Sequence, residues 1–258
     1  MSTEMPSKKE DLHGVDWKNE HTKSELSSFQ KEVLDKNETV EEKDLTRDEY
    51  EALCKKTSLT KDEIKQLVKC ANKHNGDYLI LNWLVSIDEE IAVELAKHKW
   101  VLYLNWLTSI DKDVATELWK HRWNLYLDWL VSIDKEIAGE LAKSYGSLGL
   151  NWLKNIDKDT ATELAKVYRS LGLDWLISID KDTAAELAKH KKSLYLEWLT
   201  SIDKEVAAEL AKHEWLISLY WLRSITDDVA IELAKLRSLD INEDILTQEQ
   251  KEILKNRI

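Results

Sequence analysis

Tryptophan recurs in this chain with a constant period of about 23 residues, and no other feature of the sequence constrains the fold as strongly. One template returns around each copy, L-x-L-x-W-L-x-S-I-D-x-[DE]-x-A-x-E-L-A-K, with no insertion between copies. The seven tryptophans are Trp83, Trp106, Trp129, Trp152, Trp175, Trp198 and Trp221. A chain built from identical short units must bury its core between neighbouring units, so the period predicts a solenoid.

A single unit, residues 102–124, shows what each unit contains. "LYL" alternates apolar and outward positions, which predicts a very short strand. Asp111 then stands where a helix begins, and Val114 and Leu118 share one face of that helix. A strand, a turn, a helix and a return loop in so short a unit stack only as parallel units. Two helices do not fit this period, which excludes tetratricopeptide and ankyrin repeats.

The motif L-x-L-x-x-L-x-x-I followed by a helix resembles a leucine-rich repeat, and more narrowly a bacterial variant of about 23 residues with units L-x-L-x-G-L-T-S-L-S. The resemblance covers residues 78–241. It implies an α/β leucine-rich-repeat-like solenoid: seven strand–turn–helix units, short parallel strands on one face, helices on the other, and helical caps. It also implies a binding scaffold without a defined reaction or ligand. Two departures are Trp in place of Gly, and Leu84, Leu107 and Leu130 in place of the usual turn Asn, so no asparagine ladder is expected.

The segments that flank the repeats predict four regions. Residues 1–44 are polar and heavily charged, which predicts an acidic arm that is disordered or partly helical. Residues 45–77 contain two Thr-x-x-Glu capping boxes and are expected to form a helical N-terminal cap. Residues 78–239 form the seven-unit solenoid, and residues 240–258 form a C-terminal cap with a helix. Such caps cover the open ends of a solenoid core.

Composition limits the partners. The formal net charge is −12, which argues against a nucleic acid or an anionic membrane as partner. The sequence contains no apolar run long enough to span a bilayer, and its N-terminal segment, residues 1–20, lacks the apolar core of a signal peptide. Cys54 and Cys70 form neither a disulfide framework nor a zinc motif. We therefore expect a cytoplasmic protein in a reducing compartment.

Three repeated polar rows have structural interpretations. Asp recurs at the start of six helices, but Thr226 replaces it in the seventh unit, and Thr is a good helix cap and a poor calcium ligand. The recurring histidines, expected as cationic or polar helix ends, are His98, His121, His190 and His213. Glu and Lys recur three residues apart on every helix, which predicts solvated pairs. We find no catalytic motif and predict no enzyme activity, no cofactor and no metal site.

The tryptophan row allows two interpretations. The indoles should align along one sheet edge at the strand spacing of about 4.8 Å, which permits stacking between neighbours. Stacked rings would form a structural spine. Free and evenly spaced rings would instead form an aromatic platform, and a carbohydrate-binding module is the alternative function that this row supports.

A partner is expected on the outward strand positions, because these differ between units. The first position reads Ile80, Tyr103, Tyr126, Gly149, Gly172, Tyr195, Ser218, and the second reads Asn82, Asn105, Asp128, Asn151, Asp174, Glu197, Tyr220. Tyrosines here flank an apparent notch of two glycines bordered by carboxylates, although neutral drift also explains the variation. We predict a non-catalytic scaffold for a protein or peptide of basic character. The predicted binding residues are Tyr103, Tyr126, Asp128, Gly149, Gly172, Asp174, Tyr195 and Glu197.

Overall fold

The computed structural model describes residues 44–74 and 77–255, all of which lie within one compact unit, Asp44–Ile258. The predicted N-terminal arm, apart from Asp44, lies outside the described residues.

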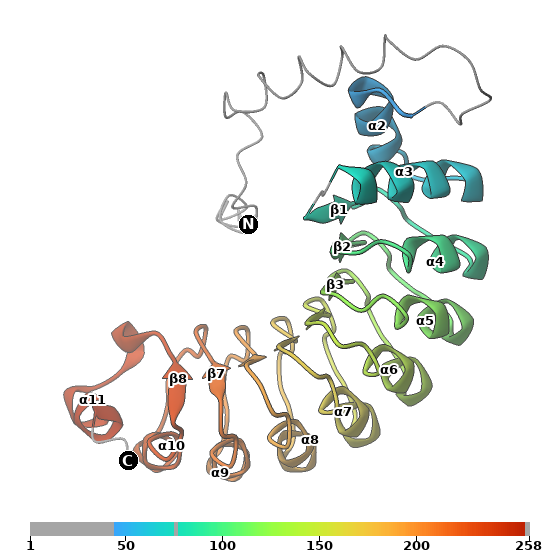
Figure 1. The fold of residues 1–258 in the computed structure, drawn as a ribbon. Coiled ribbons are helices and arrows are strands. Elements are labelled where there is room, and N and C mark those ends of the chain that lie inside the picture. The colour runs from blue at the N-terminus through green and yellow to red at the C-terminus, as the bar shows by residue number, and fades with distance from the viewer. Residues whose placement is uncertain (1–43, 75–76, 256–258) are drawn as a thin grey trace, which may run out of the picture. The chain divides into compact units, whose positions relative to one another are not determined.

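One parallel sheet runs through this unit in strict chain order (Figure 1). Equivalent residues of successive units pair, as in Leu102 with Leu125 and Leu125 with Leu148. The strands are β1 (Tyr78–Ile80), β2 (Val101–Tyr103), β3 (Leu125–Tyr126), β4 (Leu148–Gly149), β5 (Leu171–Gly172), β6 (Leu194–Tyr195), β7 (Leu216–Ser218) and β8 (Ser238–Asp240). The eighth strand continues the sheet beyond the seven predicted units, because "LDI" supplies one more pair of inward apolar residues.

Helices alternate with the strands and line the side of the stack opposite to them (Figure 1). The repeat helices are α4 (Glu89–Leu95), α5 (Lys112–Leu118), α6 (Lys135–Leu141), α7 (Lys158–Leu164), α8 (Lys181–Leu187), α9 (Lys204–Leu210) and α10 (Asp227–Leu233). The flanking elements are α2 (Arg47–Cys54), α3 (Lys61–Lys73), the 3-10 helix η1 (Glu243–Ile245) and α11 (Gln248–Lys255). The predicted α/β leucine-rich-repeat-like solenoid is therefore confirmed.

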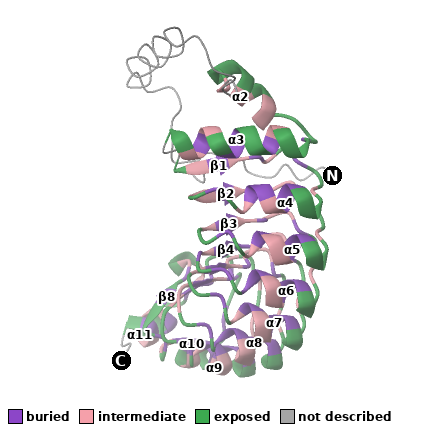
Figure 2. Ribbon diagram, turned by 45° about the vertical axis from the view of Figure 1, so that its right-hand side comes forward, coloured by how far each residue is buried: buried purple, intermediate pink, exposed green. Residues whose placement is uncertain are grey.

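The core is a stack of leucine layers between strands and helices. In the unit of β2, Leu102 and Leu104 of the strand segment and Leu107 of the turn are completely buried, and so is Leu118 of α5. The same positions are buried in the other units, while the helix surfaces turned away from the strands are exposed (Figure 2). Each unit thus buries its apolar side only against its neighbours, as the repeat requires.

Every repeat helix starts with a side-chain cap. Asp111 accepts a hydrogen bond from the amide of Val114 at 2.8 Å, and Asp134 accepts one from Ile137 at 2.8 Å. Thr226 does the same for Val229 at 3.3 Å. The capping role predicted for these residues is confirmed, and it accounts for the Asp row without a cation.

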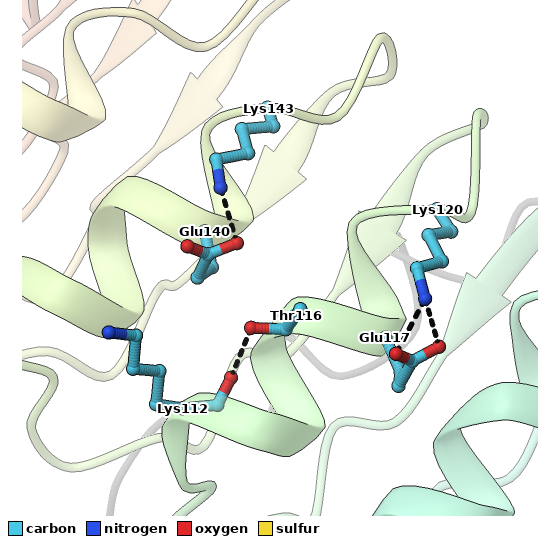
Figure 3. A network of polar contacts seen from close by, with 6 residues as sticks. All are labelled: Lys112, Thr116, Glu117, Lys120, Glu140 and Lys143. Atoms are coloured by element: carbon cyan, nitrogen blue, oxygen red, sulfur yellow. Dashed lines mark hydrogen bonds and ion pairs between the residues drawn. The ribbon is translucent and has the colours of Figure 1, made fainter.

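The repeated Glu–Lys pairs differ from expectation. Each lysine contacts the glutamate three residues earlier, as Lys120 with Glu117 and Lys143 with Glu140 show in Figure 3. The lysines are exposed, but the glutamate side chains are only 7–18% exposed. One of them, Glu163, lies against the preceding helix α6: its Oε2 atom is 3.4 Å from the position of a Cβ on Gly139. The prediction of fully solvated pairs was therefore wrong for the carboxylates.

The first and last elements cover the ends of the core. Thr46 and Thr60 form complete capping boxes with Glu49 and Glu63, and Ile64 of α3 is fully buried. At the other end, the buried Gln250 of α11 donates hydrogen bonds to the carbonyl of Ile225 and to Asp227. These contacts close the end layers, which would otherwise expose leucines to water.

Candidate binding surface

The seven indoles form one continuous stacked row along the edge where the strands end. Ring centroids of successive tryptophans lie 4.5–5.4 Å apart, closest between Trp152 and Trp175. The interplanar angles are 12–22° in the middle of the row and open to 49° between Trp83 and Trp106 at its start. Inside the row each ring therefore has a neighbouring ring against it on both sides.

This stacking limits what the row can bind. A sugar that stacks on an indole needs a free ring face, and within the row those faces meet each other. Only ring edges and the ends of the row remain accessible, and Trp83 is 45% exposed. The arrangement supports a spine that fixes the register of the units and gives less support to a carbohydrate platform.

The outward strand face holds the tyrosines that sequence analysis singled out. The rings of Tyr103 and Tyr126 stack in parallel, 4.6 Å between centroids and 7° between planes. The backbone register sets Tyr126 beside Gly149 and Gly172 beside Tyr195. The sheet therefore brings both glycines between the tyrosines, in the predicted order.

The expected open notch at the glycines is nevertheless filled. Gly149 is buried, and a Cβ there would lie 2.5 Å from Cδ1 of Tyr126 and 2.7 Å from Oδ1 of Asp128. A Cβ on Gly172 would lie 2.5 Å from Oδ1 of Asn151. Side chains of the preceding unit thus lie over each glycine, because glycine leaves them room to do so. The predicted notch of two glycines is therefore filled, and the strand face at these positions is aromatic and acidic.

The second outward position forms a ladder of side-chain acceptors that sequence analysis missed. The amide of Asn105 donates to Oδ1 of Asn82 at 3.3 Å, and the amide of Asp128 donates to Oδ1 of Asn105 at 3.5 Å. Asp174 and Asn151 repeat the contact at 3.4 Å. We had excluded an asparagine ladder from the turn position alone. The recurrence of Asn, Asp or Glu two residues earlier was the signal that would have revealed one.

Two residues at this second outward position are aspartates with perturbed acidity, and they join the ladder through their backbone amides. Burial raises the pKa of Asp128 to about 6. Burial and then the charge of Glu197 raise the pKa of Asp174 to about 7. Within the described residues, the Oδ1 atoms of both aspartates have no hydrogen-bond partner. Burial and the nearby Asp240 also raise the pKa of Glu197.

No cation compensates these acids in the part of the chain that the structure describes: no Lys, Arg or His forms an ion pair with Asp128, Asp174 or Glu197. Desolvated carboxylates without a counter-ion destabilise their own charged form. A cation brought by a partner would stabilise them, which is the chemical property of this face.

The histidines are buried pairs and not cationic helix ends. His98 stacks on His121 with 6.1 Å between centroids, and His190 stacks on His213 with 6.2 Å. Burial lowers the pKa of His98 and of His121 to about 4, so these two rings are neutral at pH 7. Burial also lowers the pKa of His190 and of His213. The predicted cationic role was therefore wrong.

Over residues 44–74 and 77–255, no group of three or more His, Cys, Asp and Glu side chains could hold a metal ion. None of the helices in these ranges is long and apolar enough to cross a membrane.

The fold and this surface define a leucine-rich-repeat-like solenoid with an aromatic, acidic strand face. No known family model matches the sequence, and no curated protein matches it either. Among solved structures, the chain is similar to an internalin (inlF) from Listeria monocytogenes, at 22% sequence identity and a TM-score of 0.44. The similarity covers 74% of this chain, which spans only 60% of that internalin.

Proposed function

We propose that this protein is a non-catalytic scaffold that binds a protein or peptide of basic character on its outward strand face. One observation carries the proposal: the stacked Tyr103 and Tyr126 adjoin a row of desolvated carboxylates that lack a counter-ion within the described residues. Tyrosine is favoured in binding surfaces, because it buries a large rigid area and keeps a polar end. Lysine or arginine from a partner would supply the missing charge.

The variation between units supports the same face. Inward leucines, indoles and helix caps are nearly uniform, so stability accounts for them. At the first outward position, by contrast, Ile, Tyr, Gly and Ser all occur among the seven units. A surface that differs from unit to unit can bind one partner in one register, whereas a uniform surface cannot.

Peptide selection tests the proposal with a matched pair of variants. A random peptide library is selected on the wild-type protein, and the affinities of enriched peptides are measured by calorimetry for Asp128→Asn/Asp174→Asn. Asparagine occupies the equivalent positions Asn82, Asn105 and Asn151, so the variant keeps the acceptor ladder and removes only charge. We expect enriched peptides to contain Lys or Arg and to bind the variant about tenfold more weakly.

The control changes the same number of charges elsewhere. Asp113 and Glu205 are exposed in the first turns of α5 and α9, so Asp113→Asn/Glu205→Gln should leave peptide affinity unchanged. Enrichment of peptides without basic residues, or equal affinity for both variants, would contradict the proposal. Binding of oligosaccharides that is lost in Trp129→Ala would favour the carbohydrate alternative.

A further inference from the structure

A second variable surface lies at the N-terminal ends of the strands, in the loops that lead from each helix to the next strand. We call it the loop edge and define it by two adjacent positions in each of the seven loops between α4 and β8. The first holds Lys99, Arg122, Tyr145, Tyr168, Lys191, Glu214 and Arg237, and the second holds Trp100, Trp123, Gly146, Arg169, Lys192, Trp215 and Ser238. Because the strands are parallel, these loops share one edge and the tryptophan row shares the other.

The loop edge is basic in an acidic protein. It carries six Lys or Arg side chains and one acid, Glu214, whereas the whole chain has a net charge of −12. In the part of the chain that the structure describes, none of these six cations forms an ion pair, although the lysine two residues after the end of each repeat helix does. Lys99, Arg122, Arg169, Lys191 and Arg237 are exposed. Their charge is therefore available to a partner.

Large aromatic side chains lie among these cations. Trp100 and Trp123 contact each other with 5.2 Å between centroids, and Tyr145 meets Tyr168 edge-on at 5.9 Å. Tyr145 and Tyr168 are 58% and 61% exposed, and Trp123 and Trp215 are each 46% exposed. Exposed aromatics on this scale, next to arginine, have the composition of an interface.

Hydrogen bonds and a close backbone contact fix the conformation of these loops. The amide of Lys99 donates to Oδ1 of Asn72 at 2.9 Å, and Ser144 donates to the carbonyl of His121 at 3.0 Å. A ring nitrogen of His213 lies 2.9 Å from the carbonyl of Lys192. At Gly146 the backbone passes so close to Trp123 that a Cβ would lie 2.0 Å from its carbonyl oxygen. A rigid edge costs a partner less ordering entropy than a loose one.

We propose that the loop edge is a second interaction surface, which binds an acidic, extended polypeptide segment. Successive units supply a cation or an aromatic ring at regular intervals, and such a row fits a chain that carries Asp or Glu along its length. The inference does not depend on the strand face, which lies on other residues and would bind the opposite charge. A scaffold with both surfaces could hold two partners together.

Single-stranded nucleic acid is the other polyanion that fits a basic, aromatic surface, and the geometry argues against it. Bases need free ring faces on which to stack. Here the rings contact each other in pairs, and Lys192 lies over the ring of Trp215 at 4.1 Å.

The test measures binding of fluorescently labelled poly-L-glutamate of about 20 residues, a length that spans several units, by fluorescence anisotropy at low salt. Arg122→Glu/Arg169→Glu should weaken binding about tenfold or more, since two attractions become repulsions. The matched control is Lys112→Glu/Lys181→Glu, which makes the same charge change at exposed positions on the helix starts and should leave affinity within about twofold. Melting temperatures show whether each variant is folded, and Lys99→Glu/Lys191→Glu provides an independent second pair on the loop edge.

Four outcomes would overturn the inference. Poly-L-glutamate does not bind the wild-type protein, or it binds wild type and both loop-edge variants equally. An oligothymidine of the same length binds more tightly and loses affinity in the same variants, which would assign the edge to nucleic acid. Sedimentation shows salt-sensitive self-association that the loop-edge variants abolish, which would assign it to a second copy of the chain. Asp128→Asn/Asp174→Asn should not change poly-L-glutamate affinity, so failure of the strand-face proposal is distinguishable.

Discussion

Removing one buried carboxylate should make this protein more stable at high pH. In the folded state burial and Glu197 raise the pKa of Asp174 from 3.8 to about 7. At about 1.4 kcal/mol for each pKa unit, this difference corresponds to about 4 kcal/mol against the charged form. Asp174 retains some solvent access, which screens part of that cost. We therefore expect Asp174→Asn to stabilise the fold by about 1–3 kcal/mol at pH 8.

The pH dependence of that gain identifies its cause. Between pH 3.8 and about pH 7 the native state of the wild type binds more protons at Asp174 than the unfolded chain does. Wild-type stability therefore loses this contribution as pH rises through the window, while the asparagine variant has no such loss. The difference in unfolding free energy should be near zero at pH 4, grow above it and level off above about pH 7. Asn151 shows that asparagine fits the ladder.

Urea titrations of both proteins at several pH values between 4 and 8 measure this difference. The histidines act in the opposite direction, but they are present in both proteins and cancel in the comparison. Asp113→Asn, at an exposed helix start, should be neutral at every pH and serves as the control. A variant less stable than wild type at pH 8, or a gain that is the same at pH 4 and pH 8, would refute the reasoning.

Three further predictions follow from other rows of the repeat. His121→Leu should stabilise the fold by about 1–2 kcal/mol at pH 7, because neither buried ring nitrogen makes a well-formed hydrogen bond within the described residues. The gain should increase toward pH 5, because the folded pKa of about 4 lies below the ordinary 6.5; equal or lower urea midpoints would contradict this. Trp129→Ala should cost about 2–4 kcal/mol, and Trp83→Ala, at the end of the row, about half as much; equal losses in chemical unfolding would argue against a stacked spine. Asp134→Ala should cost about 0.5–2 kcal/mol and Asp134→Asn almost nothing, and a melting temperature that rises by several degrees in millimolar calcium would revive a cation site.

The sequence was enough to predict the fold because its period and its inward leucines admit one solution. A unit this short cannot hold two helices, and each Leu has the same place in every copy. The eighth strand was missed because Leu239 and Ile241 start a unit that lacks the tryptophan. A search for the repeated tryptophan overlooks this incomplete unit. The inward pair Leu239 and Ile241 is nevertheless enough to add a strand to the sheet.

The details of the strand face could not be predicted, because they depend on side-chain contacts between units. Alternation shows that Tyr126 and Gly149 point outward, but not that the tyrosine ring lies over the glycine of the next unit. The raised pKa of Asp128 likewise follows from burial by its neighbours, which no linear spacing reveals. Burial of His121 at the base of a loop is the same kind of contact.

The acceptor ladder changes how the variation on this face should be interpreted. The second outward position requires a side-chain oxygen that can accept a hydrogen bond from the backbone amide of the next unit. Asn105 and Asn151 provide this oxygen. Asn accepts this hydrogen bond without a charge, whereas the Oδ1 atoms of Asp128 and Asp174 have no hydrogen-bond partner within the described residues and bring a charge to a desolvated position. Stability alone would therefore select Asn in every unit. Stability therefore does not explain why Asp128 and Asp174 are aspartates. A partner that brings positive charge to both carboxylates would offset the free-energy cost of their desolvation.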